Sequence, residues 1–217
     1  MWVAPVTLTP DYPINIRLAD APVLVIGGGH IAARKVDGLL ASGAAVTVVS
    51  PTIVAELVGR VGVRWHQRKY QRGEVASYRL AIAATGVRAV DEQISADAQA
   101  AGIPVNIADV PDLCTFTLPS ILRRGDLQVT VSSKGRSPAF SSWVRRELDR
   151  VIDDTYAQGL DIVASVRDEL HTHGRTTEIR GWHEAFDDGF LDLVASGDHD
   201  AARLHVLAHL GLDRAQR

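Results

Sequence analysis

The sequence has one cysteine, one methionine and few aromatic residues, which make up 6% of its 217 positions. A single cysteine, Cys114, cannot form an internal disulfide, so we expect a protein of the reducing cytoplasm. No apolar run approaches the roughly 20 residues that cross a bilayer, and no basic segment followed by an apolar one opens the chain. The net charge of −3 argues against a dedicated nucleic-acid-binding protein. We therefore expect neither a membrane nor a nucleic acid as a partner.

Charge is distributed unevenly along the chain. Residues 1–150 carry 13 acidic and 17 basic side chains, whereas residues 151–217 carry 13 acidic side chains and 6 arginines. A change of this size predicts a boundary near residue 150. The positive balance of the first part favours an anionic ligand there.

Short apolar segments alternate with helical patterns over the first half of the chain. The apolar segments are rich in β-branched residues, which is typical of buried strands. Strands that alternate with helices at this spacing predict an open parallel sheet of the Rossmann-like α/β class. The expected strands are Ala21–Gly27, Val46–Val49, Val63–His66, Leu80–Ala84 and Pro104–Ile107, and the expected helices are His30–Ser42, Thr52–Val58 and Val90–Ala101.

The pattern changes after Asp109. The segments Thr115–Leu118 and Gln128–Val131 resemble strands, and a helix is expected from Ser137–Pro138 to about Val151, because proline suits the first turn of a helix. The rest is helical in pattern. We therefore predict a Rossmann-like domain in residues 1–113, a small αβ segment in 114–150 and a helical C-terminal domain in 151–217. The expected C-terminal helices are Tyr156–Leu170, Thr176–Phe186, Phe190–Ala195 and His199–Leu210.

A glycine-rich turn, Gly27-x-Gly29-x-x-Ala32, lies between the first strand and the first helix, as the dinucleotide-binding fingerprint requires. Gly27 permits the tight turn, Gly29 lets the backbone approach a pyrophosphate, and Ala32 permits close packing of helix on strand. The N-terminus of the helix offers free N–H groups to the phosphates. The alternatives are a strand–helix turn without a ligand and a methyltransferase turn that binds S-adenosylmethionine.

The carboxylate that usually binds the adenosine ribose is missing from the end of the second strand, where Ser50 stands. A hydroxyl can also bond the ribose, but more weakly. Arg60 or Arg64 could meet a 2′-phosphate. The residues by themselves therefore leave the choice between NAD and NADP open.

Asp109 follows the fifth strand, at the edge of the sheet where ligands of open parallel sheets bind. A carboxylate there could act as the general base of a hydride-transfer reaction. The alternative is an aspartate that only shapes the turn before Pro111. Asn106 has the same two interpretations, a ligand contact or a hydrogen bond at the strand end.

The loop Ser132–Pro138 combines hydroxyl groups, two positive charges and a flexible glycine before a helix N-terminus. This combination is typical of a carboxylate or phosphate clamp, with Ser133, Lys134 and Arg136 as candidate substrate contacts. A plain polar connection is the alternative. A polycarboxylate substrate suits the segment better than a neutral one.

Histidines are concentrated in the last third of the chain. His171-x-His173 and the pair His205 and His209 raise the possibility of a metal site, since residues four apart share a helix face. No cysteine or HExxH pattern accompanies them. We therefore interpret them as surface polar residues and predict no metal site.

Taken together, these motifs resemble the precorrin-2 dehydrogenase / sirohydrochlorin ferrochelatase family, the dehydrogenase part of sirohaem synthase. The resemblance runs from about Tyr12 to Arg150, and its specificity comes from the order and spacing of several short motifs. These are Pro13–Leu18, Val25–Gly29, Ala33–Lys35, Gly43–Pro51, Ala83–Thr85, Val105–Asp109, Pro111–Phe116 and Val131–Pro138.

The resemblance implies NAD-dependent oxidation of the polycarboxylate tetrapyrrole precorrin-2 to sirohydrochlorin, with ferrous iron as a possible second substrate. It implies a homodimer built through the segment after Asp109, with Asp109 as the catalytic residue. A serine that is phosphorylated in some members corresponds to Ser133. The alternative is a non-catalytic sensor that binds NAD or a tetrapyrrole. The implied cofactor contacts are His30, Ile31, Ser50, Pro51, Ala84, Thr85 and Gly86.

Overall fold

The structure is a computed structural model that describes residues 11–174 and 181–212. It divides into two compact units, Met1–Leu118 and Pro119–Arg217. The division of the chain into three parts at residues 113 and 150 stays a prediction.

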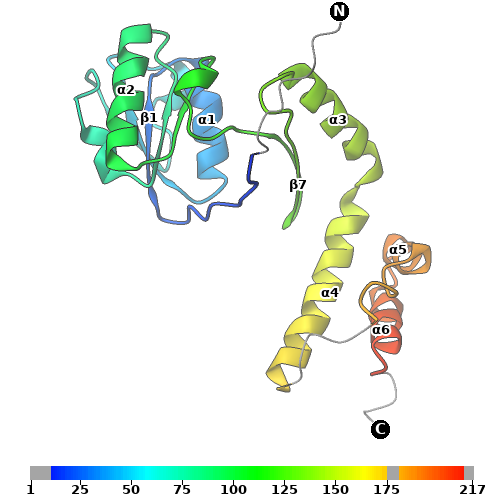
Figure 1. Ribbon diagram of the computed structural model, residues 1–217. Helices are drawn as coiled ribbons and strands as arrows, with labels where there is room; N and C mark the ends of the chain where they lie inside the picture. Colours follow the sequence, from blue (N-terminus) through cyan, green and yellow to red (C-terminus); the bar gives the residue numbers. More distant parts are fainter. Residues whose placement is uncertain (1–10, 175–180, 213–217) are drawn as a thin grey trace, which may run out of the picture. The chain divides into compact units, whose positions relative to one another are not determined.

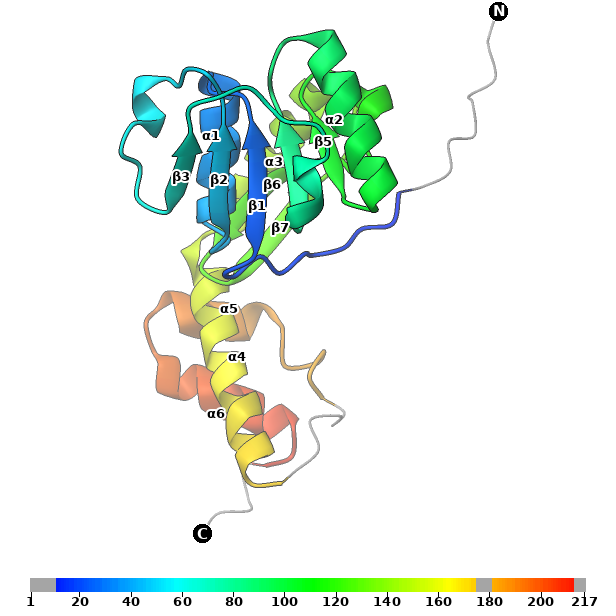
Figure 2. The ribbon, with the colours of Figure 1, turned by 90° about the vertical axis from the view of Figure 1, so that its left-hand side faces the viewer.

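The first unit is built on five parallel strands in the order β3-β2-β1-β4-β5 (Figure 2). The chain leaves β1 in one direction through β2 and β3, and then returns to the other side of β1 to form β4 and β5. This confirms the expected Rossmann-like α/β fold. The elements are β1 Pro22–Ile26, α1 His30–Leu40, β2 Ala45–Val49, η1 Ala55–Leu57, β3 Val63–His66, η2 Glu74–Ser77, β4 Leu80–Ala83, α2 Arg88–Ala101, β5 Val105–Ile107 and η3 Pro111–Leu113. The predicted helix Thr52–Val58 is thus only the short 3-10 turn η1.

Helices cover both faces of this sheet, and Figure 1 shows α1 and α2 on opposite sides of β1. Helix α1 buries Ala32, Val36 and Leu39 against one face, while α2 buries Ile94 and Ala98 against the other. Because both faces are covered, the central strands are apolar along almost their whole length instead of alternating. This explains the continuous apolar runs in the sequence.

In residues 119–174 and 181–212, the second unit consists of an antiparallel hairpin and four helices. They are β6 Ser120–Arg124, β7 Leu127–Val131, α3 Pro138–Val151, α4 Asp154–Thr172, α5 Asp188–Ala195 and α6 His199–His209. Helix α3 begins as predicted: Pro138 lies in its first turn, and the Ser137 hydroxyl accepts a hydrogen bond of 3.2 Å from the Phe140 N–H. Helices α4, α5 and α6 pack around a shared apolar core that includes Val166, Phe190 and Val206.

Two expectations for the chain after Asp109 are wrong. Residues Thr115–Leu118 are not a strand, because Thr115 is bound to the edge of β5 as a bend: its N–H donates to the Val105 carbonyl at 2.8 Å, and its hydroxyl accepts from the Val105 N–H. The strand lies further on, in β6. Of the predicted helix Thr176–Phe186, residues up to 180 lie outside the described residues, and residues 181–185 form turns. None of the helices in the described ranges is long and apolar enough to span a bilayer.

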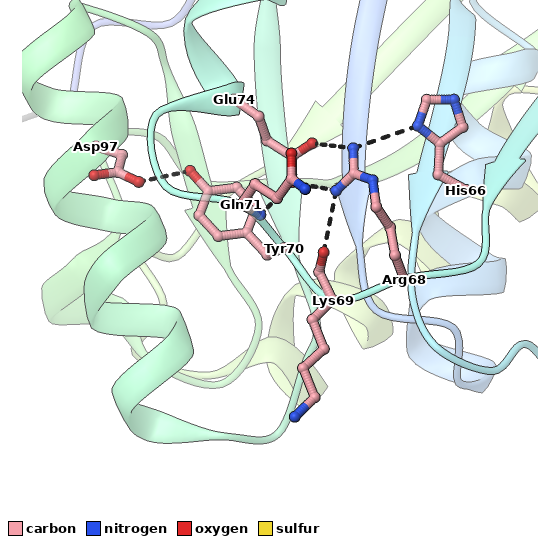
Figure 3. A network of polar contacts seen from close by, with 7 residues as sticks. All are labelled: His66, Arg68, Lys69, Tyr70, Gln71, Glu74 and Asp97. Atoms are coloured by element: carbon pink, nitrogen blue, oxygen red, sulfur yellow. Dashed lines mark hydrogen bonds and ion pairs between the residues drawn. The ribbon is translucent and has the colours of Figure 1, made fainter.

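A polar network fixes the long connection between β3 and β4 onto α2 (Figure 3). The carboxylate of Asp97 accepts hydrogen bonds from the Tyr70 hydroxyl at 2.8 Å, the Gly73 N–H at 2.7 Å and the Gln93 amide at 2.7 Å. Only 9% of the Asp97 side chain is exposed. Burial by itself raises the pKa of Asp97, but these hydrogen bonds and the charge of Arg72 outweigh it and lower the pKa. Burial and the Asp97 carboxylate together raise the pKa of Tyr70.

Asp97→Ala is expected to lower the free energy of unfolding by about 1–3 kcal/mol, because the Tyr70 hydroxyl and the Gly73 N–H lose their acceptor. Since the folded-state pKa of Asp97 lies below the unfolded value, this stabilisation is present above about pH 4 and is lost as the pH falls through the folded pKa. Urea denaturation at pH 7 and pH 3 measures both effects. Glu92→Ala on the exposed side of the same helix is the control and should change stability by less than about 0.5 kcal/mol. Equal effects of the two variants would contradict the prediction.

Candidate active site

A cavity of about 490 Å³ lies at the carboxyl ends of β1, β4 and β5. Three loops form it: the glycine turn after β1, the loop after β4 and the loop after β5. Because the strand order reverses between β1 and β4, this is the switch point at which open α/β sheets bind their ligands. The lining residues are Gly29, His30, Ile31, Ala84, Thr85, Gly86, Arg88, Asp91, Ala108, Asp109 and Val110.

The three glycines of the turn have different structural roles. A Cβ on Gly27, where φ is +114°, would lie 2.3 Å from the Ala84 carbonyl oxygen, and a Cβ on Gly28 would lie 2.0 Å from the Thr52 carbonyl oxygen. Both positions therefore need glycine for packing within the fold. A Cβ on Gly29, by contrast, would meet no heavy atom of the described residues within 4 Å. The open side of Gly29 thus leaves room for a ligand in the cavity.

The first residues of α1, His30 and Ile31, line this space, and the first N–H groups of a helix have no partner within the helix. Gly29 is the N-cap residue of α1. Because glycine has no side chain, it cannot cap these N–H groups. At the first position of the helix, His30 Nδ1 lies 3.0 Å from Glu56 Oε1, and both side chains are largely exposed. A hydrogen bond to its own backbone N–H, together with the neighbouring His30, lowers the pKa of Glu56. The free N–H groups and the positive end of the helix dipole make the start of α1 a suitable site for a phosphate group.

The loop after β4 is fixed by a buried carboxylate. The Thr85 hydroxyl donates to Asp91 Oδ1 at 2.6 Å and accepts from the Val87 N–H at 3.1 Å, and Asp91 is only 4% exposed. This holds the backbone of Ala84 to Gly86 in one position along the cavity. Arg88 also lines the cavity, and its Nε donates to Glu92 at 2.6 Å.

Asp109 lines the cavity from the loop after β5, is exposed, and adopts left-handed backbone geometry with φ of 61°. The flanking residues fix this geometry: the Ala108 N–H donates to the Ala83 carbonyl, and the Val110 N–H donates to the Ile107 carbonyl. Non-glycine residues in this region are uncommon and concentrate at functional sites. Burial and the neighbouring Arg34 lower the pKa of Lys35 on α1, while the charge of Asp109 acts in the opposite direction.

Several predicted site residues do not line the cavity. Ser50 is buried at the end of β2, where its carbonyl accepts from the Trp65 indole N–H, and Pro51 follows it on the surface. The Asn106 amide donates to the Phe116 carbonyl at 3.0 Å. Asn106 therefore already has a structural hydrogen bond. The cofactor and substrate roles of these residues stay predictions.

The Ser/Lys/Arg loop belongs to the second unit. The Ser133 hydroxyl donates to the Ser137 carbonyl and is also bonded by the Ser137 N–H and the Ser141 hydroxyl, at 2.9–3.2 Å. Lys134 has left-handed geometry with φ of 55°, and the Arg136 N–H donates to the Ser133 carbonyl. The loop is therefore ordered by its own hydroxyl groups. The substrate contacts and the phosphorylation of Ser133 stay predictions.

Sequence reasoning missed four lining residues: Arg88, Asp91, Ala108 and Val110. Arg88 and Asp91 lie in the first turn of α2, directly after the loop that follows β4. They could have been found, because a helix that begins at the carboxyl end of a parallel strand places its first turn beside the ligand site. Ala108 and Val110 are the chain neighbours of Asp109, so they line the cavity because Asp109 does.

Comparison with known proteins agrees with this architecture. Residues 14–120 match the family model described as "Putative NAD(P)-binding", and residues 124–150 match "Sirohaem biosynthesis protein central". The chain is 36% identical over 205 residues to a sirohaem synthase of Nitrosomonas eutropha and 37% identical over 196 residues to one of Methylobacillus flagellatus. The alignments cover 92% and 88% of this chain but 43% and 42% of the relatives, so the chain spans less than half of their length. Among solved structures, "SirC, precorrin-2 dehydrogenase" matches with a TM-score of 0.69 and 26% identity over 89% of this chain and 98% of that one.

The fold and the glycine turn define a Rossmann-like protein of the NAD(P)-binding class, which confirms the expected kind of cofactor at the level of the family. The second family model lies directly after the first and in the order that the motifs predict. The chain belongs to the precorrin-2 dehydrogenase / sirohydrochlorin ferrochelatase family, the dehydrogenase part of sirohaem synthase.

Proposed function

We propose that the chain catalyses the NAD-dependent oxidation of precorrin-2 to sirohydrochlorin. The observation that carries this proposal is a single cavity with a dinucleotide-type glycine turn on one wall and Asp109 on another. The oxidation removes one hydride and one proton from the substrate, so it needs a hydride acceptor and a base. The wall with the glycine turn would hold NAD⁺ as the hydride acceptor, and Asp109 would serve as the base.

The residues of the cavity divide the work between binding and proton transfer. The open side of Gly29 and the N-terminus of α1 bind the pyrophosphate, and the Thr85–Asp91 hydrogen bond holds the Ala84–Gly86 backbone along the rest of the dinucleotide. When bound, NAD⁺ supplies the hydride acceptor. The Asp109 carboxylate removes the proton, and its exposed position leaves it accessible to a large substrate.

A polycarboxylate substrate fits the charges of this part of the chain. Residues 1–150 carry more basic than acidic side chains, and Arg88 lies in the cavity wall. Guanidinium groups bind carboxylates in bidentate pairs, so Arg88 is a candidate for one substrate carboxylate. Of the other predicted substrate contacts, Asn106 and Ser133 already make hydrogen bonds within the fold, so Lys134 and Arg136 are the stronger candidates for further carboxylates.

We also propose ferrous iron as a second substrate, inserted into sirohydrochlorin by the same chain. The curated relatives carry the name sirohaem synthase, which favours this step, whereas the solved structure is named for dehydrogenation alone. Metal entry releases protons from two pyrrole nitrogens. Asp109, the exposed carboxylate of the cavity lining, would accept these two protons in turn and pass each to solvent.

An anaerobic assay of the purified chain with precorrin-2 tests both steps. With NAD⁺ alone, we expect NADH and sirohydrochlorin in equal amounts, and addition of Fe²⁺ should then convert the product to sirohaem. Absence of NADH formation would refute the proposed function. NADH formation without metal insertion would restrict the chain to dehydrogenation.

We propose that residues 114–150 are a dimerisation segment and that the chain forms a homodimer. Of residues 119–152, all of which the structure describes, only Leu122 and Ser141 are buried. On α3, Phe140 is 58% and Trp143 is 48% exposed, and their rings lie 5.4 Å apart. A hairpin and a helix with so little buried apolar surface need a partner that covers them.

Sedimentation velocity at micromolar concentration should therefore show a dimer. Trp143→Glu should shift the equilibrium toward the monomer, because it places a charge in the covered apolar surface. Leu204→Glu is the matched control, since Leu204 is 57% exposed on α6, and this variant should remain dimeric. A monomeric native chain, or equal effects of the two variants, would contradict the prediction.

A further inference from the structure

The helical part of the second unit gathers three metal-ligating side chains at one point. They are Asp187, directly before α5, and His205 and His209, one turn apart on α6. One potential ligand atom from each residue lies within 4.8 Å of those of the other two. The imidazole rings of the two histidines are 4.4 Å apart between centroids.

The hydrogen bonds around these residues leave ligand atoms available. His209 Nδ1 lies 2.9 Å from the His205 carbonyl oxygen, so Nδ1 carries the proton and Nε2 keeps its lone pair. Asp187 Oδ1 accepts the Phe190 N–H at 2.8 Å, and a carboxylate oxygen that accepts one hydrogen bond can still bind a metal ion through its other lone pair. Metal-binding histidines usually donate their other ring nitrogen to a carbonyl or carboxylate, which is the arrangement that His209 shows.

His205 provides a second and independent observation. Its Nε2 atom is buried and has no hydrogen-bond partner among the described residues. Asp187 Oδ1 lies 3.2 Å away, but the contact does not meet hydrogen-bond geometry. A buried ring nitrogen without an aligned partner is costly unless another group satisfies it. A cation between His205 and Asp187 would do so.

We propose that Asp187, His205 and His209 bind a divalent transition-metal ion of the Zn²⁺ type. Two imidazoles and one carboxylate are a common ligand set for such ions, with one position left for water. Half of the Asp187 side chain is exposed, so an ion can enter from solvent. The ion would join the start of α5 to α6 and stabilise the helical core.

Zn²⁺ titration of the full-length chain without a purification tag, after treatment with a chelator, tests the proposal by calorimetry and thermal denaturation. We expect one ion per chain and a rise in melting temperature with Zn²⁺. Loss of an outer-shell partner typically weakens metal binding about 10- to 100-fold, and loss of a direct ligand should cost no less. His209→Gln, an exposed change, should therefore weaken binding at least about tenfold. Asp187→Asn should weaken it as well while keeping the helix cap, because asparagine caps helices as well as aspartate does.

Two controls separate this site from ordinary surface histidines. His199→Gln changes an exposed histidine of the same helix outside the cluster, and the double variant His171→Gln/His173→Gln removes the other histidine pair. Both should bind Zn²⁺ like the native chain. With Co²⁺ as the probe, the visible absorption of a histidine-ligated ion should disappear in His205→Gln. Absence of saturable binding, or an equal loss in either control, would overturn the proposal.

Discussion

Asp109→Asn is expected to reduce precorrin-2 oxidation about 10²–10⁴-fold, the usual contribution of a general base. Affinity for NAD⁺ should stay near that of the native chain, because the lost interaction belongs to the transition state. The left-handed geometry at this position, with φ of 61°, makes asparagine the appropriate replacement. Asparagine tolerates this geometry and has nearly the same size as aspartate, but it cannot accept the proton. Anaerobic turnover and NAD⁺ titration measure the two quantities.

Asp112→Asn is the matched control for this experiment. Asp112 is an exposed acid in the next turn of the chain, η3, and does not line the cavity. It should leave both turnover and NAD⁺ affinity unchanged. Native turnover in Asp109→Asn would return Asp109 to the role of a residue that shapes the turn before Pro111.

Gly29→Asp should weaken NAD⁺ binding more than about 100-fold without unfolding the chain. The new carboxylate would occupy the open side of the turn and oppose the charge of the pyrophosphate, and like charges brought together cost several kcal/mol. The fold should tolerate the change, because Gly29 is the N-cap residue of α1 and aspartate is a preferred N-cap. Calorimetric titration with NAD⁺ and urea denaturation of the same sample give both values.

Two neighbouring variants show whether charge or packing is responsible. Gly29→Ser also caps the helix but carries no charge, so it should weaken binding less than Gly29→Asp. Gly28→Ala should instead destabilise the fold, because its Cβ would lie 2.0 Å from the Thr52 carbonyl oxygen. If a well-folded Gly29→Asp variant binds NAD⁺ like the native chain, the proposed location of the pyrophosphate is wrong.

The parallel sheet and the glycine turn could be predicted because their signals are local. The apolar segments, the glycines and the helix that follows them are contiguous in the sequence, and the packing of Gly27 and the openness of Gly29 follow from the geometry of one turn. The position of Asp109 could be predicted for a similar reason, since it directly follows a strand. Its left-handed geometry could not, because it depends on hydrogen bonds of the flanking residues to Ala83 on β4 and to Ile107 on β5.

Other features depend on contacts between distant segments. Strand β6 was missed because Arg123 and Arg124 make it polar, although the Gly125–Asp126 pair before β7 is a known hairpin signal. Thr115 lies in a segment whose sequence resembles a strand, but its hydroxyl accepts a hydrogen bond from the Val105 N–H on β5, and the chain bends there. The same limit applies to His205 and His209, whose acidic neighbour comes from the chain before a different helix.

The core shared by α4, α5 and α6 bears on how this family diverges. The second of the two family models ends at Arg150, and α4 begins at Asp154. Helices that satisfy their apolar contacts among themselves constrain one another, so a substitution in one of them is compensated within the same three helices. These three helices can therefore accumulate changes together, or be exchanged between relatives by recombination as a single unit. A chimaera joined at Ile152 and Asp153, between α3 and α4, would keep these three helices together but would place the Arg124–Asp154 ion pair across the junction.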